Sequence, residues 1–396
     1  LSMVEFAKGM ENLKASDIRE ILKVTAMPEI ISFAGGLPAP ELFPVEKIKE
    51  ATDIVLEEAG RQALQYGITE GYPKLREQIA ERLYANNGIK TSVENITLVA
   101  GSQQGLDFIG KMFIDPGDVV LMESPSYLGA INAFQPYSPT YAEVPTDDNG
   151  LIMEELEKIL ATTDRVKLIY VIPDFQNPSG RTWPLERRKK FMEIITRYEI
   201  PVIEDNPYGE LRFSGDFLPS LKSMDTKGLV LYLGTFSKIL APGYRIGWIC
   251  AHERYLEKLN LIAQSAVLQT ATISPMIISK YIELNDLDAH VAEIRAVYKH
   301  RCDVMIGAMK EYFPPEAKFT IPDGGLFTWV ELPDYIDTKK MAAEAIEQKV
   351  AYVPGAGFFP NGGNDHCMRL NYSCMPDERI VEGIKRLAQV IKNNLR

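Results

Sequence analysis

The feature that most constrains the fold is an alternation of short strand-forming runs with helical patterns between residues 93 and 251. Helical patterns at residues 103–114, 151–161 and 184–198 separate several of these runs. Strands connected in this way favour a largely parallel sheet with helices on both faces. The last strand follows its predecessor after a short connection, so we expect it to run antiparallel. The expected strands are ITLVA (96–100), VVLME (119–123), YAEVP (141–145), KLIYVIP (167–173), PVIED (201–205), LVLYLG (229–234) and IGWICA (246–251).

Helical segments flank this region on both sides. Residues 11–28 and 45–59 have helical patterns, and the Gly- and Pro-rich run ISFAGGLPAPELFP between them predicts an ordered loop. A long helical stretch at 253–312 leads to a second, smaller region that closes with a helix at 377–393. The strands expected in that smaller region lie within residues 319–332, 350–359 and 367–373.

The length of 396 residues exceeds the size at which one hydrophobic core usually stops growing. We therefore predict an α/β protein with a mostly parallel seven-stranded sheet in a large domain and a smaller α/β domain beside it. The expected division is residues 1–50 as an N-terminal segment belonging to the small domain, 51–285 as the large domain and 286–396 as the C-terminal small domain.

The composition argues against several classes of function. The 43 Lys and Arg residues against 54 Asp and Glu give a formal charge of -11, which disfavours nucleic acid as a partner. The four cysteines form no CxxC pair and favour a cytoplasmic location, and the four histidines show no metal-binding spacing. The sequence has neither an apolar run of transmembrane length nor a signal-peptide pattern at its start, so no membrane association is expected.

The segment GTFSKILAPGYRIGW, residues 234–248, combines a lysine with an anion-binding set of side chains. Lys238 can form a Schiff base with an aldehyde, while Thr235, Ser237 and Arg245 have the donors that a phosphate requires. Pyridoxal 5'-phosphate needs both kinds of contact. A Ser-x-Lys dipeptide alone is more often a loop with a partly buried lysine, so other motifs must decide.

Two further motifs follow expected strands, where ligands bind in parallel α/β sheets. AGSQQG, residues 100–105, opens a helix, and its backbone amides with Ser102 and Gln103 suit an anion, although such a turn is often only a helix cap. IEDNPYG, residues 203–209, brings Asp205 and Tyr208 to the end of a strand. A carboxylate there can pair with a protonated pyridine nitrogen, although Asp before Asn-Pro is also a common turn.

Two more strand ends add polar and aromatic groups. PDFQNPSG contains Asn177, which can hydrogen-bond a ring oxygen, and ESPSYLGA contains Tyr127, which can stack on a planar ring. Each motif alone is compatible with a simple turn. Because all of them occupy strand ends, they indicate one site for a planar, phosphorylated, nitrogen-containing ring.

The joint pattern of NPSG, EDNPYGEL and TFSKILAPGYRIGW resembles the fold-type I, class I and II pyridoxal-phosphate aminotransferases. The resemblance is greatest to the subgroup with kynurenine/2-aminoadipate and broad-specificity aminotransferases, and to the aminotransferase-like half of a class of bacterial transcription regulators. It runs from SFAGGLPAPELFP to RLNYS, nearly the whole chain. The resemblance implies a fold-type I transferase with pyridoxal 5'-phosphate as cofactor.

The resemblance also implies roles for the residues around the cofactor ring. Lys238 would hold the cofactor as an internal aldimine and shuttle a proton between the substrate's α-carbon and the cofactor. Asp205 would pair with the pyridine nitrogen, Asn177 and Tyr208 would bind the ring oxygen, and Tyr127 would stack on the ring. The residues expected to hold the phosphate are Ser102, Gln103, Ser237, Arg245 and Thr235, the last at a position where the family often has Ser.

Four more residues receive roles only through the resemblance. Arg369, in MRLNYS, would clamp the substrate α-carboxylate together with Asn177, and Gly36 belongs to a loop that covers the substrate. Arg19 would lie near the substrate side chain. Tyr66 would reach the phosphate of the neighbouring subunit, which implies a homodimer with shared active sites.

The implied activity is ping-pong transfer of an α-amino group from an amino acid to a 2-oxo acid, with 2-oxoglutarate as the expected acceptor. The donor is expected to be aromatic, 2-aminoadipate or a broad set. Another pyridoxal-phosphate reaction, such as β-elimination or decarboxylation, stays open because the same cofactor site supports different chemistry. A non-catalytic, ligand-sensing relative of the regulators is a further alternative, although the family pattern begins within the first few dozen residues.

Overall fold

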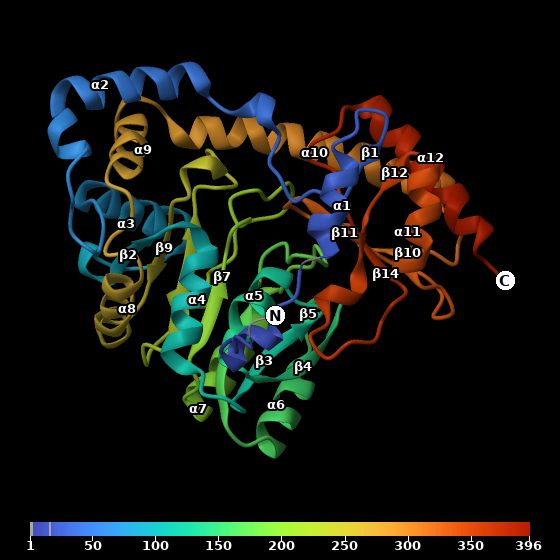
Figure 1. Cartoon of the computed structure of the whole chain (residues 1–396), viewed down its shortest axis with the longest axis horizontal. Coiled ribbons are helices and arrows are strands. Elements are labelled where there is room, and N and C mark those ends of the chain that lie inside the picture. Colours follow the sequence, from blue (N-terminus) through green and yellow to red (C-terminus); the bar gives the residue numbers. More distant parts are fainter. Residues whose placement is uncertain (1–2, 16) are drawn as a thin grey trace.

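A large mixed sheet forms the centre of the molecule (Figure 1). The computed structural model describes residues 3–15 and 17–396. Strands β3, β4, β6, β7 and β8 are parallel, and β9 is antiparallel to both of its neighbours, which confirms the expected direction of the last strand. In order across the sheet the strands are β2 (Ile96–Val99), β9 (Gly247–Cys250), β8 (Val230–Thr235), β7 (Val202–Asp205), β6 (Val166–Val171), β3 (Val119–Ser124), β4 (Thr140–Asp147) and β5 (Gly150–Leu151).

The sheet has eight strands where the sequence predicted seven. The additional strand, β5, has two residues and pairs antiparallel with the end of β4. A tight turn makes this pairing: Asn149 donates its backbone N–H to the Asp147 carboxylate at 2.8 Å, and Gly150 has φ of 89°. The helical pattern that was expected from residue 151 therefore begins two residues later, after this strand.

Helices cover both faces of the sheet, as the alternating pattern predicted. On β6, Leu168 and Tyr170 belong to one hydrophobic core, whereas Ile169 and Val171 belong to another, because successive strand residues point to opposite faces. Helices α4 (Gly101–Phe113), α5 (Leu128–Phe134) and α8 (Glu253–Ala266) pack in the first core. Helices α6 (Met153–Thr162) and α7 (Leu185–Tyr198) pack in the second.

The long helical stretch expected at 253–312 is three helices rather than one. Leu268, with φ of 68°, lies in the first break, and the Asp286 side chain accepts the backbone N–H of Ala289 at 3.0 Å to begin the last helix. After α8, these are α9 (Ile273–Leu284) and α10 (Leu287–Tyr312); they pack in a third core with α2 (Val45–Ala63) and α3 (Pro73–Asn87).

A smaller sheet lies at the C-terminal side of the molecule. Its strands in order are β10 (Lys318–Phe319), β11 (Phe327–Glu331), β14 (Cys367–Asn371) and β13 (Val353–Pro354). Beside it, β1 (Ile31–Ser32) pairs with β12 (Val350–Ala351), which brings the N-terminal segment to the C-terminal region; α11 (Thr338–Glu347) and α12 (Asp377–Asn393) complete this region. The expected single strand at 350–359 is thus two short strands that pair with different partners.

Helix α10 packs in two hydrophobic cores. Its first half, with Val291 and Ile294, packs beside the large sheet, and its second half, with Met305 and Met309, packs beside the small sheet. The predicted domain division at residue 286 therefore falls at the start of a helix that contributes to both cores, and it stays a prediction.

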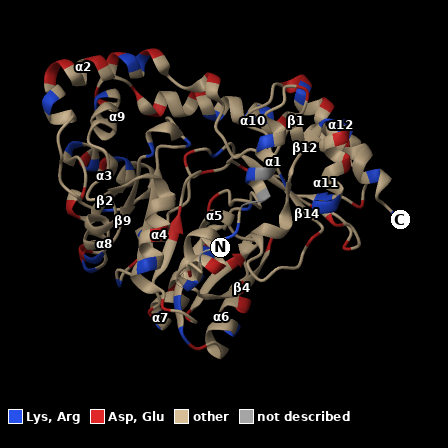
Figure 2. Ribbon diagram, viewed as in Figure 1, with Lys and Arg blue, Asp and Glu red and all other residues tan. Residues whose placement is uncertain are grey.

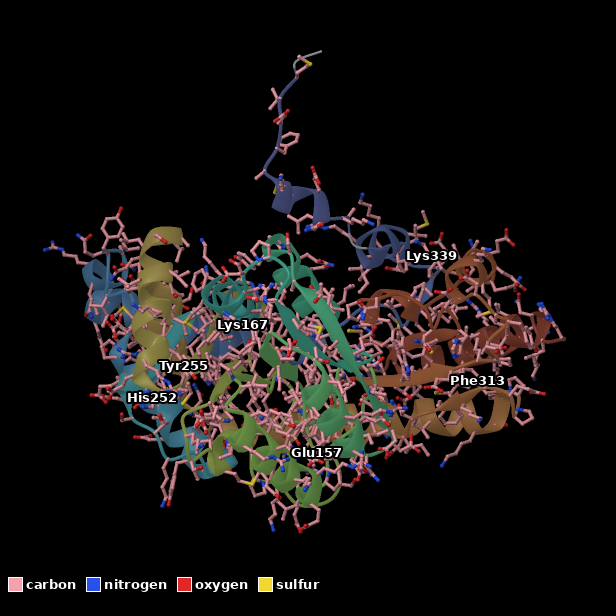
Figure 3. All side chains as sticks on the ribbon, turned by 90° about the horizontal axis from the view of Figure 1, so that it is seen from below. Glu157, Lys167, His252, Tyr255, Phe313 and Lys339 are labelled. Atoms are coloured by element: carbon pink, nitrogen blue, oxygen red, sulfur yellow. The ribbon has the colours of Figure 1, made fainter. Side chains whose placement is uncertain are left out.

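The N-terminal segment is less helical than its pattern predicted. Of the expected helix at 11–28, the structure describes α1 (Asp17–Thr25), preceded by the short 3-10 helix η1 (Lys8–Asn12). Asn12 donates to the Ser138 hydroxyl at 3.0 Å, while the first described residues extend away from the body (Figure 3). The other 3-10 helices are η2 (Pro40–Leu42), η3 (Val93–Asn95), η4 (Gln135–Tyr137), η5 (Lys222–Met224), η6 (Pro242–Tyr244) and η7 (Gly355–Phe358).

Acidic and basic residues are interspersed on the outer helices, including α2 and α12 (Figure 2). Among the described residues, none of the helices combines the length and apolar character needed to cross a membrane. The described part of the chain also has no cluster of three or more His, Cys, Asp or Glu side chains suited to a metal ion.

Gly234 provides a test of the packing between β8 and β9. It pairs with Trp248, whose indole ring occupies the space that a Cβ on Gly234 would need. We expect Gly234→Ala to lower the free energy of unfolding by about 1–3 kcal/mol, because the ring must move. Gly307 lies at an exposed helical position with open space around it. Gly307→Ala should therefore raise the free energy of unfolding by about 0.5–1 kcal/mol. Denaturant titration of both variants measures the difference, and equal shifts would contradict this packing.

Candidate active site

One cavity of about 360 Å³ lies at the carboxyl ends of the central strands. Asp205 and Thr235 are the last residues of β7 and β8, Arg369 comes from β14 of the small sheet, and the remaining polar groups come from loops and from the N-terminus of α4. All the predicted site residues except Tyr66 and Arg19 line this cavity. They are Gly36, Ser102, Gln103, Tyr127, Asn177, Asp205, Tyr208, Thr235, Ser237, Lys238, Arg245 and Arg369.

Lys238 lies among cations and apolar surface. Its Nζ donates to the Gly36 carbonyl at 2.8 Å and lies 5.9 Å from the centre of the Tyr208 ring. Burial lowers the pKa of the Lys238 amine to about 8, and the nearby Arg369 and Arg245 act in the same direction. The neutral form of this amine, which is nucleophilic and basic, is therefore far more populated near neutral pH than in an exposed lysine.

Asp205 has one satisfied and one unsatisfied oxygen. The Tyr170 hydroxyl donates to Oδ2 at 2.5 Å, while Oδ1 is buried with no hydrogen-bond partner among the described residues. Burial raises the pKa of Asp205 to about 6, and the Tyr170 hydrogen bond and the charge of Lys238 act against that rise. The unsatisfied acceptor fits a protonated ring nitrogen, which would supply the missing donor.

Tyr170 is a site residue that the sequence reasoning missed. It lies within the apolar run KLIYVIP, where it resembles an ordinary strand residue. A buried tyrosine hydroxyl usually has a partner, and that rule was the available signal. Sheet register places Tyr170 opposite Ile203, so its ring reaches the end of the neighbouring strand β7.

Donors for an anion gather around the end of β8. Thr235 Oγ1 donates to Ser237 Oγ at 2.9 Å and accepts the Ser237 backbone N–H at 3.0 Å. The Arg245 guanidinium packs so closely on Gly101, whose φ is 77°, that a side chain at residue 101 would collide with it. Gly101 begins α4, so the arginine and the positive end of that helix face the same part of the cavity. This donor set fits a phosphate.

Arg369 forms the opposite end of the cavity. Its Nη1 donates to Asn177 Oδ1 at 3.0 Å, its Nη2 donates to the Ala34 carbonyl at 3.1 Å, and its Nε has no partner among the described residues. The guanidinium also lies 4.2 Å from the Phe327 ring centre. Burial lowers the pKa of Arg369 to about 10, which still leaves it charged at neutral pH. A buried arginine with a free donor suits a carboxylate ligand.

Two predicted site residues lie outside the cavity. Tyr66 is 78% exposed, in the loop between α2 and α3, and Arg19 is exposed on α1. The neighbour of Arg19, Ile18, lines the cavity instead. Leu37, which belongs with Gly36 to the loop expected to cover the substrate, also lines the cavity. The sequence reasoning assigned no site role to Ile18 or to the lining residues Ile172, Pro207 and Pro242, because apolar residues carry no chemical signal of their own.

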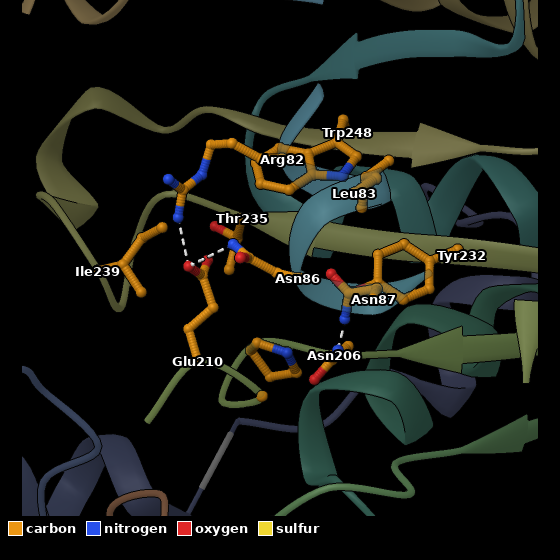
Figure 4. A pocket seen from close by; sticks show the side chains of 12 residues that line it. Arg82, Leu83, Asn86, Asn87, Asn206, Glu210, Tyr232, Thr235, Ile239 and Trp248 are labelled. Atoms are coloured by element: carbon orange, nitrogen blue, oxygen red, sulfur yellow. Dashed lines mark hydrogen bonds and ion pairs between the residues drawn. The ribbon is translucent and has the colours of Figure 1, made fainter. Parts of the chain in front are cut away.

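The loop that follows Asp205 and carries Tyr208 is held by contacts around a second, small cavity of about 30 Å³ (Figure 4). The Glu210 carboxylate accepts hydrogen bonds from Arg82 and from Asn86, the latter at 3.1 Å. These contacts tie the loop after β7 to α3 and so limit the movement of the site residues on it.

The Lys238 amine, the unsatisfied Asp205 oxygen and the anion donors beside α4 together fit pyridoxal 5'-phosphate, which offers an aldehyde, a ring nitrogen and a phosphate. The other buried donor, Arg369, stays available for a second anion. The donor set thus accommodates the cofactor and a carboxylate at the same time.

Comparison with known proteins agrees with this chemistry. Residues 29–387 match the family described as aminotransferase class I and II. The chain is 47% identical over 395 residues to aromatic-amino-acid aminotransferase 1 of Thermococcus litoralis, covering 99% of this chain and 95% of that protein.

Solved structures give the same result. A kynurenine aminotransferase of Pyrococcus horikoshii superposes with a TM-score of 0.95 at 43% identity, covering 99% of this chain and 98% of that one. An α-aminoadipate aminotransferase of Thermus thermophilus, complexed with N-(5'-phosphopyridoxyl)-L-leucine, superposes with a TM-score of 0.91 at 39% identity, covering 98% and 97%. The chain therefore belongs to the class I and II aminotransferases, which are pyridoxal 5'-phosphate enzymes of fold type I.

Proposed function

We propose that this aminotransferase moves the α-amino group of aromatic amino acids and 2-aminoadipate to 2-oxoglutarate in a ping-pong sequence. The observation that carries the proposal is the presence of a partly neutral Lys238 and a buried Arg369 with a free Nε–H in one cavity. Such a pair offers an amino acid both a base and a carboxylate clamp. The names of the Thermococcus, Pyrococcus and Thermus relatives support this choice of donors.

The proposed cofactor contacts follow from the donor set. Thr235, Ser237 and Arg245, with Ser102 and Gln103 in the first turn of α4, would hold the phosphate. Asp205, kept charged by the hydrogen bond from Tyr170, would pair with the ring nitrogen. Asn177 and Tyr208, which hydrogen-bond each other at 3.4 Å, would bind the ring oxygen, and Tyr127 would stack on the ring.

The chain's own residues would then control the proton and the substrate. Bound pyridoxal phosphate supplies an electron sink that stabilises negative charge at the substrate's α-carbon. Lys238, as the neutral amine, would remove the proton from the α-carbon of the amino donor. In the reverse half-reaction it would deliver a proton to the α-carbon derived from the oxo acid. Arg369 and Asn177 would orient the α-carboxylate, and the Gly36 loop would help to exclude water.

The entrance of the cavity favours apolar donor side chains. Ile18 and the 60% exposed Leu37 line it, and the Phe327 ring lies beside Arg369. Arg19, next to Ile18 on α1, is available to an acidic donor such as 2-aminoadipate if its side chain turns inward. This combination supports a donor range that includes aromatic residues and 2-aminoadipate.

We also propose that the chain acts as a homodimer with shared sites in the cytoplasm. The loop residues Leu64, Tyr66 and Ile68 and the facing Val267 and Leu268 are all exposed, and their loops are joined by a hydrogen bond from Thr69 to the Leu268 carbonyl at 3.0 Å. Exposed apolar residues gathered in this way are typical of a subunit interface. Free thiols at all four cysteines are consistent with a reducing compartment.

The activity is tested by the two half-reactions of the loaded enzyme. We expect phenylalanine or 2-aminoadipate to convert the absorbance of the aldehyde form of the cofactor to that of the amine form, and 2-oxoglutarate to reverse the change. Lys238→Ala should lose both conversions, because the base is gone. Release of ammonia or carbon dioxide in place of this cycle would identify a lyase.

The lowered pKa of Lys238 predicts how cofactor uptake depends on pH. Uptake of pyridoxal phosphate by cofactor-free protein, followed by absorbance, requires the neutral amine. Its rate should therefore rise with pH, with a midpoint at about 8, and level off above it. A midpoint near the ordinary lysine value of 10.5 would contradict the buried, cationic environment.

The shared site is tested at Tyr66. If its hydroxyl binds the partner's phosphate, Tyr66→Phe loses a charge-assisted hydrogen bond, and the cofactor dissociation constant should rise about tenfold with the dimer intact. Tyr84→Phe, at a 61% exposed tyrosine on α3, is the matched control and should leave the constant unchanged. Cofactor titration measures the dissociation constant, and sedimentation measures the oligomeric state. A monomeric protein, or a Tyr66→Phe variant with the cofactor dissociation constant of the wild type, would refute the shared site.

A further inference from the structure

Glu123 is a buried carboxylate that lies behind the active-site cavity without lining it. It is the second-last residue of β3, and only 2% of it is exposed. Its Oε2 accepts the backbone N–H of Ile172 at 3.1 Å and the side-chain N–H of Gln176 at 3.3 Å, and its Oε1 accepts the Trp183 indole N–H at 2.8 Å. Among the described residues it forms no ion pair; its three hydrogen-bond donors are neutral, and the nearby charge of Arg181 also favours the carboxylate.

Gln176 connects this carboxylate to two loops of the active site. Its Nε2 also donates to the Pro125 carbonyl at 2.7 Å, and its Oε1 accepts the backbone N–H of Ser179 at 3.1 Å. Pro125 lies two residues before Tyr127, and Gln176 directly precedes Asn177. A single side chain therefore ties the loop of the proposed ring-stacking tyrosine to the loop of the proposed ring-oxygen ligand.

We propose that Glu123 is a positioning residue of the active site, which acts through Gln176 to hold Asn177 and Tyr127 at their working separation. The proposal rests on the roles proposed above for these two residues. Arg369 extends the effect to the substrate end, because it donates to Asn177 Oδ1 at 3.0 Å.

The donor arrangement requires a carboxylate at this position. Three N–H groups point at two oxygens, and each oxygen receives at least one of them. A glutamine at residue 123 would turn its NH₂ group toward a donor in either orientation, and one buried hydrogen bond would become a donor–donor contact. Trp183 is fully buried against Phe191 in an edge-on ring contact, so Gln176, in a loop, is the group that would move.

The hydrogen bonds at Glu123 act against the effect of burial. Burial raises the pKa of Glu123 to about 7, and its three hydrogen bonds and the charge of Arg181 oppose the rise. A charge held by neutral donors in a dry environment depends strongly on their placement. The carboxylate and its donors therefore fix one another's positions.

Strand β7, separated from β3 by β6, supplies a matched control. Glu204 is 1% exposed and accepts the backbone N–H groups of Leu221 and Lys222 at 2.7 and 2.8 Å. Burial raises its pKa to about 7 as well. Glu204 points to the face of the sheet opposite to Asp205, and its partners belong to neither active-site loop.

The test compares Glu123→Gln, Gln176→Leu and Glu204→Gln in the full-length enzyme. We expect both glutamate variants to lower the melting temperature. Only Glu123→Gln and Gln176→Leu should raise the dissociation constant for pyridoxal phosphate and the KM for the amino donor, each about tenfold, because displacement of site groups by a fraction of an ångström has effects of this size.

The combined variant Glu123→Gln/Gln176→Leu should have a cofactor dissociation constant no higher than that of either single variant, because the two residues act in one chain of contacts. A Glu123→Gln variant that loses stability but keeps the wild-type cofactor constant would overturn the proposal, as would additive effects. If Glu123→Gln does not fold, Gln176→Leu decides alone. The cofactor constant is measured without turnover, so failure of the proposed donor range leaves this test intact.

Discussion

The hydrogen bond from Arg369 to Asn177 joins the two sheets of the molecule inside the active site. Arg369 belongs to β14 of the small sheet, and Asn177 follows β6 of the large sheet. The proposed substrate clamp and the proposed cofactor contacts therefore exist together only when the two sheets are packed in one arrangement. Phe327 of β11 strengthens this junction, because its ring contacts both Arg369 and Tyr208. The site is a property of the packing between the two regions rather than of either sheet alone.

Charge balance explains why the same junction binds anions. Among the side chains that the structure describes, Lys238, Arg245 and Arg369 line one cavity with a single carboxylate, Asp205. Burial of this excess positive charge is unfavourable, and it lowers the pKa of both Lys238 and Arg369. A ligand that brings a phosphate to one end and a carboxylate to the other relieves the imbalance at both arginines. The electrostatic cost in the protein thus favours the pair of ligands that an aminotransferase must hold together.

The sequence predicted most of the cavity because parallel strands bring their carboxyl ends to one edge. For Asp205 and Thr235, a correct assignment of their strands was enough to predict that they lie in the cavity. The residues that it missed, Tyr170 and Phe327, act through contacts between distant segments, which no local pattern reveals. The break between α9 and α10 was also missed, because it depends on one capping side chain, Asp286. Tyr66 and Arg19 rested on resemblance alone, and both lie on exposed surface where the fold of one chain does not fix their partners.

Three buried carboxylates near the strand ends differ in whether the protein itself supplies hydrogen-bond donors to both of their oxygens. Glu123 and Glu204 each have both oxygens occupied by N–H donors of the protein. Asp205 is equally buried, but its Oδ1 has no partner among the described residues. An unsatisfied buried carboxylate oxygen is costly, and a ligand that supplies a donor in the cavity removes that cost. This difference supports Asp205 as the proposed partner of the cofactor, whereas Glu123, with both oxygens occupied, is proposed to act on the site only through the groups that it holds.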